Sequence, residues 1–210
     1  MSKLRLTGST SGFTELTAPA VAGSNTLTLP TGNGTAGQFL QTNGSGALSF
    51  ASAGKILQVV STTKTDTFTT TTILNTSSGG AQITGLTATI TPTSASSKIL
   101  VIANVSGNGT TNVSQVLMRL YRDSTIIGTP ANVSNRPGVT GRIYFNDPNA
   151  TNVVSIMHLD SPATTSAITY SIYAGPDVAG TIYINRTQND SDQANSARTP
   201  SVITVMEVAA

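Results

Sequence analysis

Apolar residues change their pattern near residue 54 of this 210-residue chain. In residues 1–53 they occur as isolated pairs among Thr, Ser, Gly and Asn. From residue 54 onward, runs of Val, Ile, Thr and Tyr alternate with clusters of Gly, Pro, Asn and Ser, which is typical of short β-strands joined by turns. No segment shows a helical apolar period over the length that a helix needs. We therefore expect an all-β protein, with an extended glycine-rich N-terminal arm over residues 1–53 and a head domain over residues 54–210.

The spacing of the apolar runs predicts that the head is an antiparallel β-sandwich of jelly-roll-like form. The expected strands are Lys55–Ser61, Thr67–Leu74, Gln82–Ile90, Lys98–Ser106, Val113–Arg122, Gly141–Phe145, Asn152–Asp160, Ala167–Ala174, Thr181–Asn185 and Ser201–Val208.

Two of these strands, around residues 99–105 and 202–208, are apolar on both faces. One face of each strand can fill the sandwich core, and the other face needs a second cover. In a chain with few charges the simplest cover is an identical subunit, although loops of the same chain could serve instead. We expect a homotrimer whose subunit interface contains Ile99, Val101, Val202 and Met206.

The N-terminal arm has too few apolar side chains to close a core of its own. Ordering a residue costs about 1–2 kcal/mol of backbone entropy, so we expect the arm to be ordered only where another surface covers its apolar pairs. Within it, Pro30 ends a short strand, and Asn43-Gly44 predicts a tight hairpin turn. The arm is expected to attach the protein to its assembly through Leu27, Leu29, Phe39, Leu40, Leu48 and Phe50.

Charge and composition exclude several classes of partner. Charged residues make up 10% of the chain, the net charge is +2, and the basic residues form no cluster, so no nucleic-acid partner is expected. No apolar run is long enough for a membrane span, so insertion into a membrane is not expected. The chain has no cysteine, which excludes disulfides and thiolate metal sites.

The glycine-rich stretch Gly32-Asn33-Gly34-Thr35-Ala36-Gly37 matches the dinucleotide-binding pattern G-x-G-x-x-G. That motif needs a buried strand before it and a helix after it, whereas here Pro30 precedes it and a short strand is expected to follow. We interpret these residues as turn glycines and expect no cofactor.

His158, the single histidine, should share a strand face with Val154, Ile156 and Asp160. A His/Asp pair and a serine could support nucleophilic catalysis, but the chain has no G-x-S-x-G elbow, so a structural histidine is the favoured interpretation. The oxygen-rich run Asn189-Asp190-Ser191-Asp192 lacks the bidentate glutamate of a calcium loop, and we expect no metal there. The tyrosines could line a sugar-binding face, although packing is the more ordinary role.

Several segments resemble bacteriophage virion surface proteins of the tail-fibre and head-decoration type, as in phages of cyanobacteria and other aquatic bacteria. In the N-terminal arm they are Leu16-Thr17-Ala18-Pro19-Ala20, Leu27-Thr28-Leu29-Pro30 and Gly37-Gln38-Phe39-Leu40-Gln41-Thr42-Asn43-Gly44-Ser45-Gly46-Ala47-Leu48-Ser49-Phe50. In the head they are Ile90-Thr91-Pro92-Thr93-Ser94, Leu120-Tyr121-Arg122-Asp123-Ser124, Asp160-Ser161-Pro162 and Ser201-Val202-Ile203-Thr204-Val205-Met206-Glu207.

This resemblance implies a non-enzymatic virion protein: a short trimeric fibre or fibre-like knob, bound to other virion proteins through its arm and contacting the host surface. A capsid decoration or cement protein on the major capsid lattice is the alternative. A fibre head that binds or cleaves host surface glycans is a third interpretation. Cleavage would need paired carboxylates, and most of the nine carboxylates here are expected in turns or at strand ends.

Overall fold

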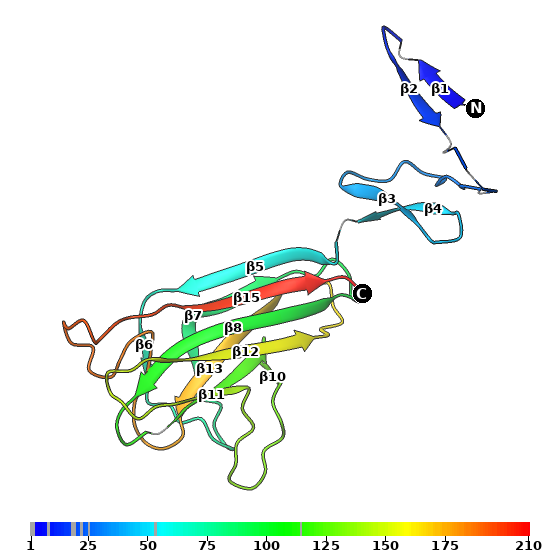
Figure 1. Ribbon diagram of the computed structural model, residues 1–210. Helices are drawn as coiled ribbons and strands as arrows, with labels where there is room; N and C mark the ends of the chain where they lie inside the picture. Colours follow the sequence, from blue (N-terminus) through cyan, green and yellow to red (C-terminus); the bar gives the residue numbers. More distant parts are fainter. Residues whose placement is uncertain are drawn as a thin grey trace. The chain divides into compact units, whose positions relative to one another are not determined.

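The computed structural model describes residues 3–7, 9–17, 20–21, 23–24, 26–52, 54–113 and 115–210. The chain divides into an N-terminal unit, Met1–Gly54, and a head, Lys55–Ala210 (Figure 1). Every regular element in the described ranges is a β-strand, which confirms the all-β prediction. No helix of the length and apolarity that a membrane crossing requires occurs in these ranges.

The N-terminal unit contains two antiparallel hairpins, β1 (Lys3–Thr7) with β2 (Phe13–Thr17) and β3 (Gln38–Thr42) with β4 (Leu48–Ser52). The second hairpin contains the predicted Asn43-Gly44 turn, but its loop is five residues long because Thr42 pairs with Leu48. The Asn43 side-chain oxygen accepts hydrogen bonds from the backbone N–H groups of Ser45 and Ala47 and so closes this wider loop.

The head consists of two antiparallel sheets that face each other (Figure 1). The six-stranded sheet has the order β5-β15-β8-β14-β6, with β12 also paired to β8. The five-stranded sheet has the order β10-β9-β13-β7, with β11 also paired to β9. The strands are β5 (Ile56–Lys64), β6 (Phe68–Thr70), β7 (Ala81–Ile90), β8 (Lys98–Gly109), β9 (Gln115–Arg122), β10 (Thr125–Ile127), β11 (Gly141–Tyr144), β12 (Asn152–Asp160), β13 (Ile168–Pro176), β14 (Ile182–Ile184) and β15 (Ser201–Val208).

The core lies between these sheets because alternate residues of each strand point inward. On β15 the buried positions are Ser201, Ile203, Val205 and Glu207, and the positions between them are half-buried. The inward side chains come from both sheets and are mostly β-branched, as a sandwich core requires. The largest fully buried ones are Tyr170, Leu74, Ile83, Leu86, Ile90, Ile99, Met118, Leu120, Ile156, Ile172, Ile182 and Ile184. This arrangement confirms the predicted antiparallel sandwich.

Candidate functional site

The outer face of the six-stranded sheet carries an apolar row that crosses four strands. Val59 on β5 lies opposite Met206 on β15, Met206 lies opposite Leu100 on β8, and Leu100 lies opposite Leu159 on β12. Val59 is 55% exposed and Leu159 is 50% exposed. Side chains directly opposite on one face of a sheet contact each other, so these four form one continuous apolar surface.

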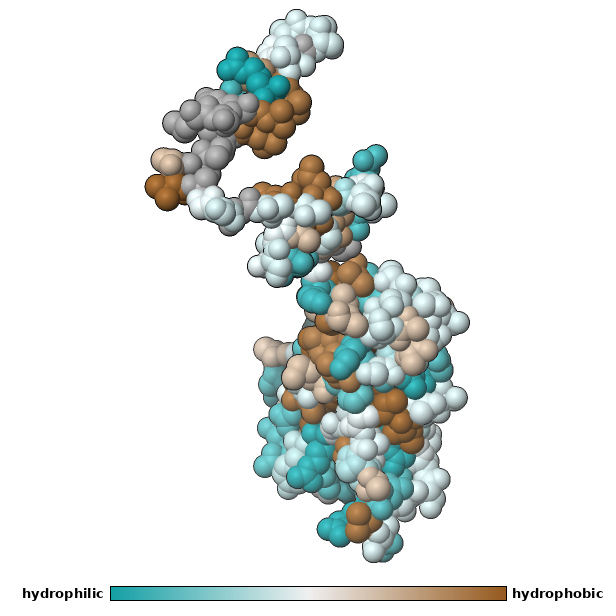
Figure 2. Space-filling view, turned by 90° about the vertical axis from the view of Figure 1, so that its right-hand side faces the viewer, coloured by the Kyte–Doolittle hydropathy of each residue, from teal (hydrophilic) through white to brown (hydrophobic). Residues whose placement is uncertain are grey.

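The neighbouring rows extend this surface. Ile102 on β8 pairs with Met157 on β12, whose side chain is 74% exposed, and Val202 on β15 lies opposite Asn104. We call the surface formed by Val59, Leu100, Ile102, Met157, Leu159, Val202 and Met206 the apolar outer face. Apolar residues are visible on the surface of the head and of the N-terminal unit in Figure 2.

Two of the residues predicted at a subunit interface lie elsewhere. Ile99 and Val101 are fully buried in the sandwich core, on the opposite face of β8 from Leu100 and Ile102. Their placement on an outer face was therefore wrong, because successive residues of a strand point to opposite sides. Val202 and Met206 do lie on the apolar outer face. Whether this face meets another subunit stays a prediction.

Five residues of the apolar outer face were not identified from the sequence as candidates for contact: Val59, Leu100, Ile102, Met157 and Leu159. Finding them requires knowing which alternate residues of a strand point outward. The sequence does not show this where both faces of a strand are apolar, as in Ile99-Leu100-Val101-Ile102.

The candidate attachment residues lie in the second half of the N-terminal unit. Leu27 and Leu29 are 66% and 71% exposed, and they flank Thr28, which forms a parallel bridge to Ala47. Phe39 and Leu40 on β3 are nearly half exposed. Leu48 and Phe50 on β4 are partly covered, and the Phe50 ring lies against Gly34. Most of these side chains are thus available to an external surface.

His158 faces the sandwich interior together with Ile156 and Asp160, as the alternation predicted. The Asp160 carboxylate accepts hydrogen bonds from Arg122 Nη1, at 2.8 and 3.0 Å, and from the Tyr170 hydroxyl at 2.7 Å. Burial and this hydrogen bond to Asp160 raise the pKa of Tyr170 above its ordinary value. Asp160 therefore links the two sheets through an arginine and a tyrosine, rather than orienting His158 as a base.

The oxygen-rich loop at residues 189–192 is organised around arginine. Both Asp190 carboxylate oxygens accept hydrogen bonds from Arg198, at 2.7 and 2.9 Å, and Arg186 lies 3.7 Å away. The hydrogen bond from Arg198 and the two positive charges hold the pKa of Asp190 below its usual value. Among the described residues, no group of three or more His, Asp or Glu side chains lies close enough together to hold a metal ion.

Glu207 is a buried carboxylate at the end of β15. Its Oε1 accepts hydrogen bonds from the Thr93 backbone N–H and hydroxyl, at 2.8 and 2.7 Å, and its Oε2 accepts one from Gln58 at 2.6 Å. Burial opposes ionisation, but the hydrogen bonds from Gln58, Thr93 and Ser97 outweigh it and lower the pKa of Glu207 to about 2. Glu207 thus links the turn before β8 to β15 through hydrogen bonds, and its carboxylate is not exposed to solvent.

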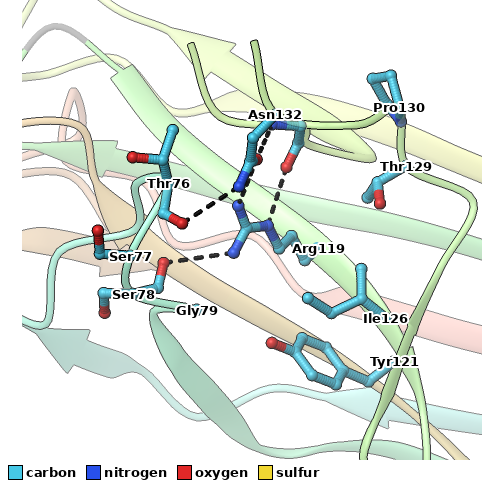
Figure 3. A pocket seen from close by; sticks show the side chains of 11 residues that line it. Thr76, Ser77, Ser78, Gly79, Arg119, Tyr121, Ile126, Thr129, Pro130 and Asn132 are labelled. Atoms are coloured by element: carbon cyan, nitrogen blue, oxygen red, sulfur yellow. Dashed lines mark hydrogen bonds between the residues drawn. The ribbon is translucent and has the colours of Figure 1, made fainter. Parts of the chain in front are cut away.

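A cavity of about 390 Å³ lies on the outer face of the five-stranded sheet (Figure 3). Its floor contains Arg119 and Tyr121 of β9, which point away from the core residues Met118 and Leu120. Its walls come from the loop before β7, at residues 76–79, and from the loop after β10, at residues 129–138. Sequence reasoning did not single out Arg119, because an arginine within a predicted strand reads as a solvated surface charge.

Comparisons with known proteins give no family assignment. No family model and no curated protein matches the chain. Three solved structures of infectious bursal disease virus match it: the Gx strain, at 14% identity, TM-score 0.35 and 78% of this chain; a mutant VP2 protein from T=1 particles, at 14%, 0.35 and 95%; and a VP2 subviral particle, at 15%, 0.33 and 77%. The chain spans 39%, 43% and 40% of those chains. These neighbours are viral structural proteins, but at such TM-scores the likeness carries no argument about function.

Proposed function

We propose that this chain is a non-enzymatic structural protein of a virion surface, whose head forms a homotrimer through the apolar outer face. The observation that carries the proposal is the apolar row from Val59 to Leu159, whose two outermost side chains are at least half exposed in the single chain. On the outer face of β8 and of its paired strands β12 and β15, Lys98 is the sole charged residue among the described side chains.

The size of the face supports association. Four strands about 4.8 Å apart and about seven residues at 3.4 Å each give a sheet face of roughly 450 Å². The polar residues Ser61, Asn104, Ser155 and Thr204 also lie on this face, so its apolar part is smaller. Monomeric proteins rarely expose a continuous apolar patch larger than a few hundred Å². A stable interface buries about 800 Å² per partner, so this face would supply about half of one. Loops of the head or the N-terminal unit would supply the remainder.

The N-terminal unit is proposed to anchor the trimer to other virion proteins. Its exposed apolar residues, including Leu27 and Leu29, are suited to burial against a partner. In the leading form of the proposal the partners are tail proteins, and the head is a short fibre or fibre-like knob that contacts the host surface. In the alternative, the same unit lies across major capsid subunits and the protein decorates the capsid. Locating the protein on the particle distinguishes the two.

The oligomer is tested by light scattering on the full-length protein, with Met157→Lys as the variant. The wild type is expected to contain three chains. A lysine at position 157 would place a charge in the interface, which costs several kcal/mol when the charge is buried, so the variant should be monomeric at micromolar concentration. Val178→Lys is the matched control, since Val178 is exposed but lies in the loop between β13 and β14.

A monomeric wild type, or a trimer that persists in Met157→Lys, would contradict the proposed interface. A dimer that Met157→Lys dissociates would keep the surface but reject the threefold symmetry.

A further inference from the structure

Arg119 is a buried cation on the outer face of the five-stranded sheet. The residue is 5% exposed, and no carboxylate of the described residues lies within ion-pair distance of it. Its guanidinium donates instead to neutral oxygens: Nε to Gly138 O at 2.9 Å, Nη2 to Asn75 O at 2.9 Å, and Nη1 to Ser78 O at 3.3 Å. The positive charge is thus solvated by peptide dipoles but not neutralised.

These bonds leave part of the guanidinium unused. Nη2 also donates to Asn132 Oδ1 at 3.5 Å, so four of the five N–H groups of Arg119 have acceptors among the described residues. One N–H of Nη1 has no acceptor among the described residues. The same bonds fix the two loops that form the cavity walls, so the cavity is held open by the residue that supplies its charge (Figure 3).

The rest of the lining is suited to a sugar. Thr76, Ser77 and Thr129 supply hydroxyl groups, and Tyr121 and Pro130 supply apolar surface. No Asp or Glu lines the cavity. Its volume of about 390 Å³ lies within the range of small-ligand sites. A cation in a walled cleft attracts anions more strongly than the same charge does on an open surface.

We propose that this cavity binds a saccharide that carries a carboxylate, such as a uronic acid residue of a surface polysaccharide. The carboxylate would lie against Arg119, because a carboxylate accepts charge-assisted hydrogen bonds from a guanidinium, and the ring would lie against Tyr121. A neutral sugar could use the hydroxyl groups but would leave the buried charge uncompensated.

A second cavity of about 390 Å³ is a reason to propose an acidic polymer, rather than an isolated sugar, as the ligand. It is lined by Arg136 and Arg142, with Asp177 as the carboxylate of its lining. Its walls include Asn75 and Asn135, which belong to the same two loops as the walls of the Arg119 cavity. The two cavities therefore adjoin along these loops and offer consecutive cationic positions.

That the saccharide belongs to a host surface rests on the proposed function, but the binding site itself does not. The cavity lies on the five-stranded sheet and the apolar outer face on the six-stranded sheet, so they occupy opposite sides of the sandwich. Binding can be measured on the protein in any oligomeric state. If the protein binds no sugar, the proposed trimer is not contradicted. If the protein is a monomer, the proposed binding site is not contradicted.

The test compares glucuronic acid with glucose, by isothermal titration calorimetry on the full-length protein, in wild type, Ile126→Glu and Ile126→Gln. Ile126 lines the cavity and is 40% exposed, so both variants should fold. The wild type is expected to bind glucuronic acid at least tenfold more tightly than glucose. Ile126→Glu places a carboxylate beside Arg119 and should weaken glucuronic acid binding at least tenfold relative to Ile126→Gln, with little effect on glucose.

The pair Ser77→Asp and Ser77→Asn repeats the comparison from the opposite wall, where Ser77 is exposed. Equal affinity for the two sugars, no binding of glucuronic acid up to millimolar concentration, or equal affinities within both acid and amide pairs would overturn the proposal.

Discussion

The buried carboxylate of Glu207 should make the head sensitive to acid, and Glu207→Gln isolates its contribution. In the folded protein both oxygens are occupied by donors: Thr93 contributes its N–H and hydroxyl, and Gln58 contributes one N–H. An amide at this position keeps one acceptor oxygen but presents an NH₂ group to donors that then have no acceptor. A buried unsatisfied donor costs about 1–3 kcal/mol, more when the lost partner was charged.

The size of the effect follows from the pKa of Glu207, which falls from 4.5 to about 2 on folding. That difference corresponds to about 3 kcal/mol. The folded-state pKa is below the unfolded one, so the stabilisation is fully present above about pH 5 and is lost as the pH falls through about 2. Relative to Glu207→Gln, the wild type should therefore lose about 3 kcal/mol of its advantage between pH 6 and pH 2.

Urea unfolding, followed by far-ultraviolet circular dichroism at one protein concentration, measures this difference at each pH. Other titrating groups are shared by both proteins and cancel in the difference. Thr93→Val is the matched control: it keeps the backbone N–H donor and loses the hydroxyl, so it should cost about 1 kcal/mol at neutral pH. A wild-type advantage that does not change between pH 6 and pH 2 would refute the reasoning.

Three further substitutions test other parts of the structure. Asp160→Asn should destabilise the head by about 2–4 kcal/mol in urea, because it leaves Arg122 without its buried partner; a loss below 1 kcal/mol would contradict this. His158→Gln should change the free energy of unfolding by less than the roughly 1 kcal/mol of one hydrogen bond, and it should not change the release of reducing ends from polysaccharide, because Asp160 is bound to Arg122 and Tyr170; polysaccharide cleavage that disappears in this variant would favour an enzyme. Gly34→Ala should expose the N-terminal unit to limited proteolysis without changing head unfolding, because Gly34 has φ +68° and an added Cβ would lie 2.7 Å from the Phe50 ring; unchanged cleavage would count against this packing.

Strand positions could be predicted from the sequence where turn residues flank an apolar run on both sides. β12 and β15 begin and end at the predicted residues, since Ser161-Pro162 follows the first and Pro200 precedes the second. β10 was missed, because three residues are too few to show an alternation. Its turn also lacks the usual glycine, and Asp123 adopts φ 51° there instead.

The surfaces were less predictable than the strands, because the sequence did not show which alternate residues of a strand point into the core. β8 and β15 are apolar on both faces, so alternation alone does not say which set points inward. On β15 the inward set includes Ser201 and Glu207, two polar residues that pattern analysis assigns to solvent. Their burial depends on donors distant in the sequence, such as Thr93 for Glu207. The Arg119 cavity depends likewise on two loops that reach the same strand from opposite directions along the chain.

The two proposals together predict avidity. If three heads associate through the apolar outer face, their Arg119 cavities, on the opposite sheet, stay open to one polymer. A second binding event on the same chain then proceeds at an effective concentration near millimolar, which can raise overall affinity by about 10²–10⁴-fold without any new contact. A polyuronate should therefore bind the wild-type trimer far more tightly than it binds Met157→Lys, whereas free glucuronic acid should bind both equally. Calorimetry on both ligands decides the matter, and equal polyuronate affinity for the two proteins would separate saccharide binding from assembly.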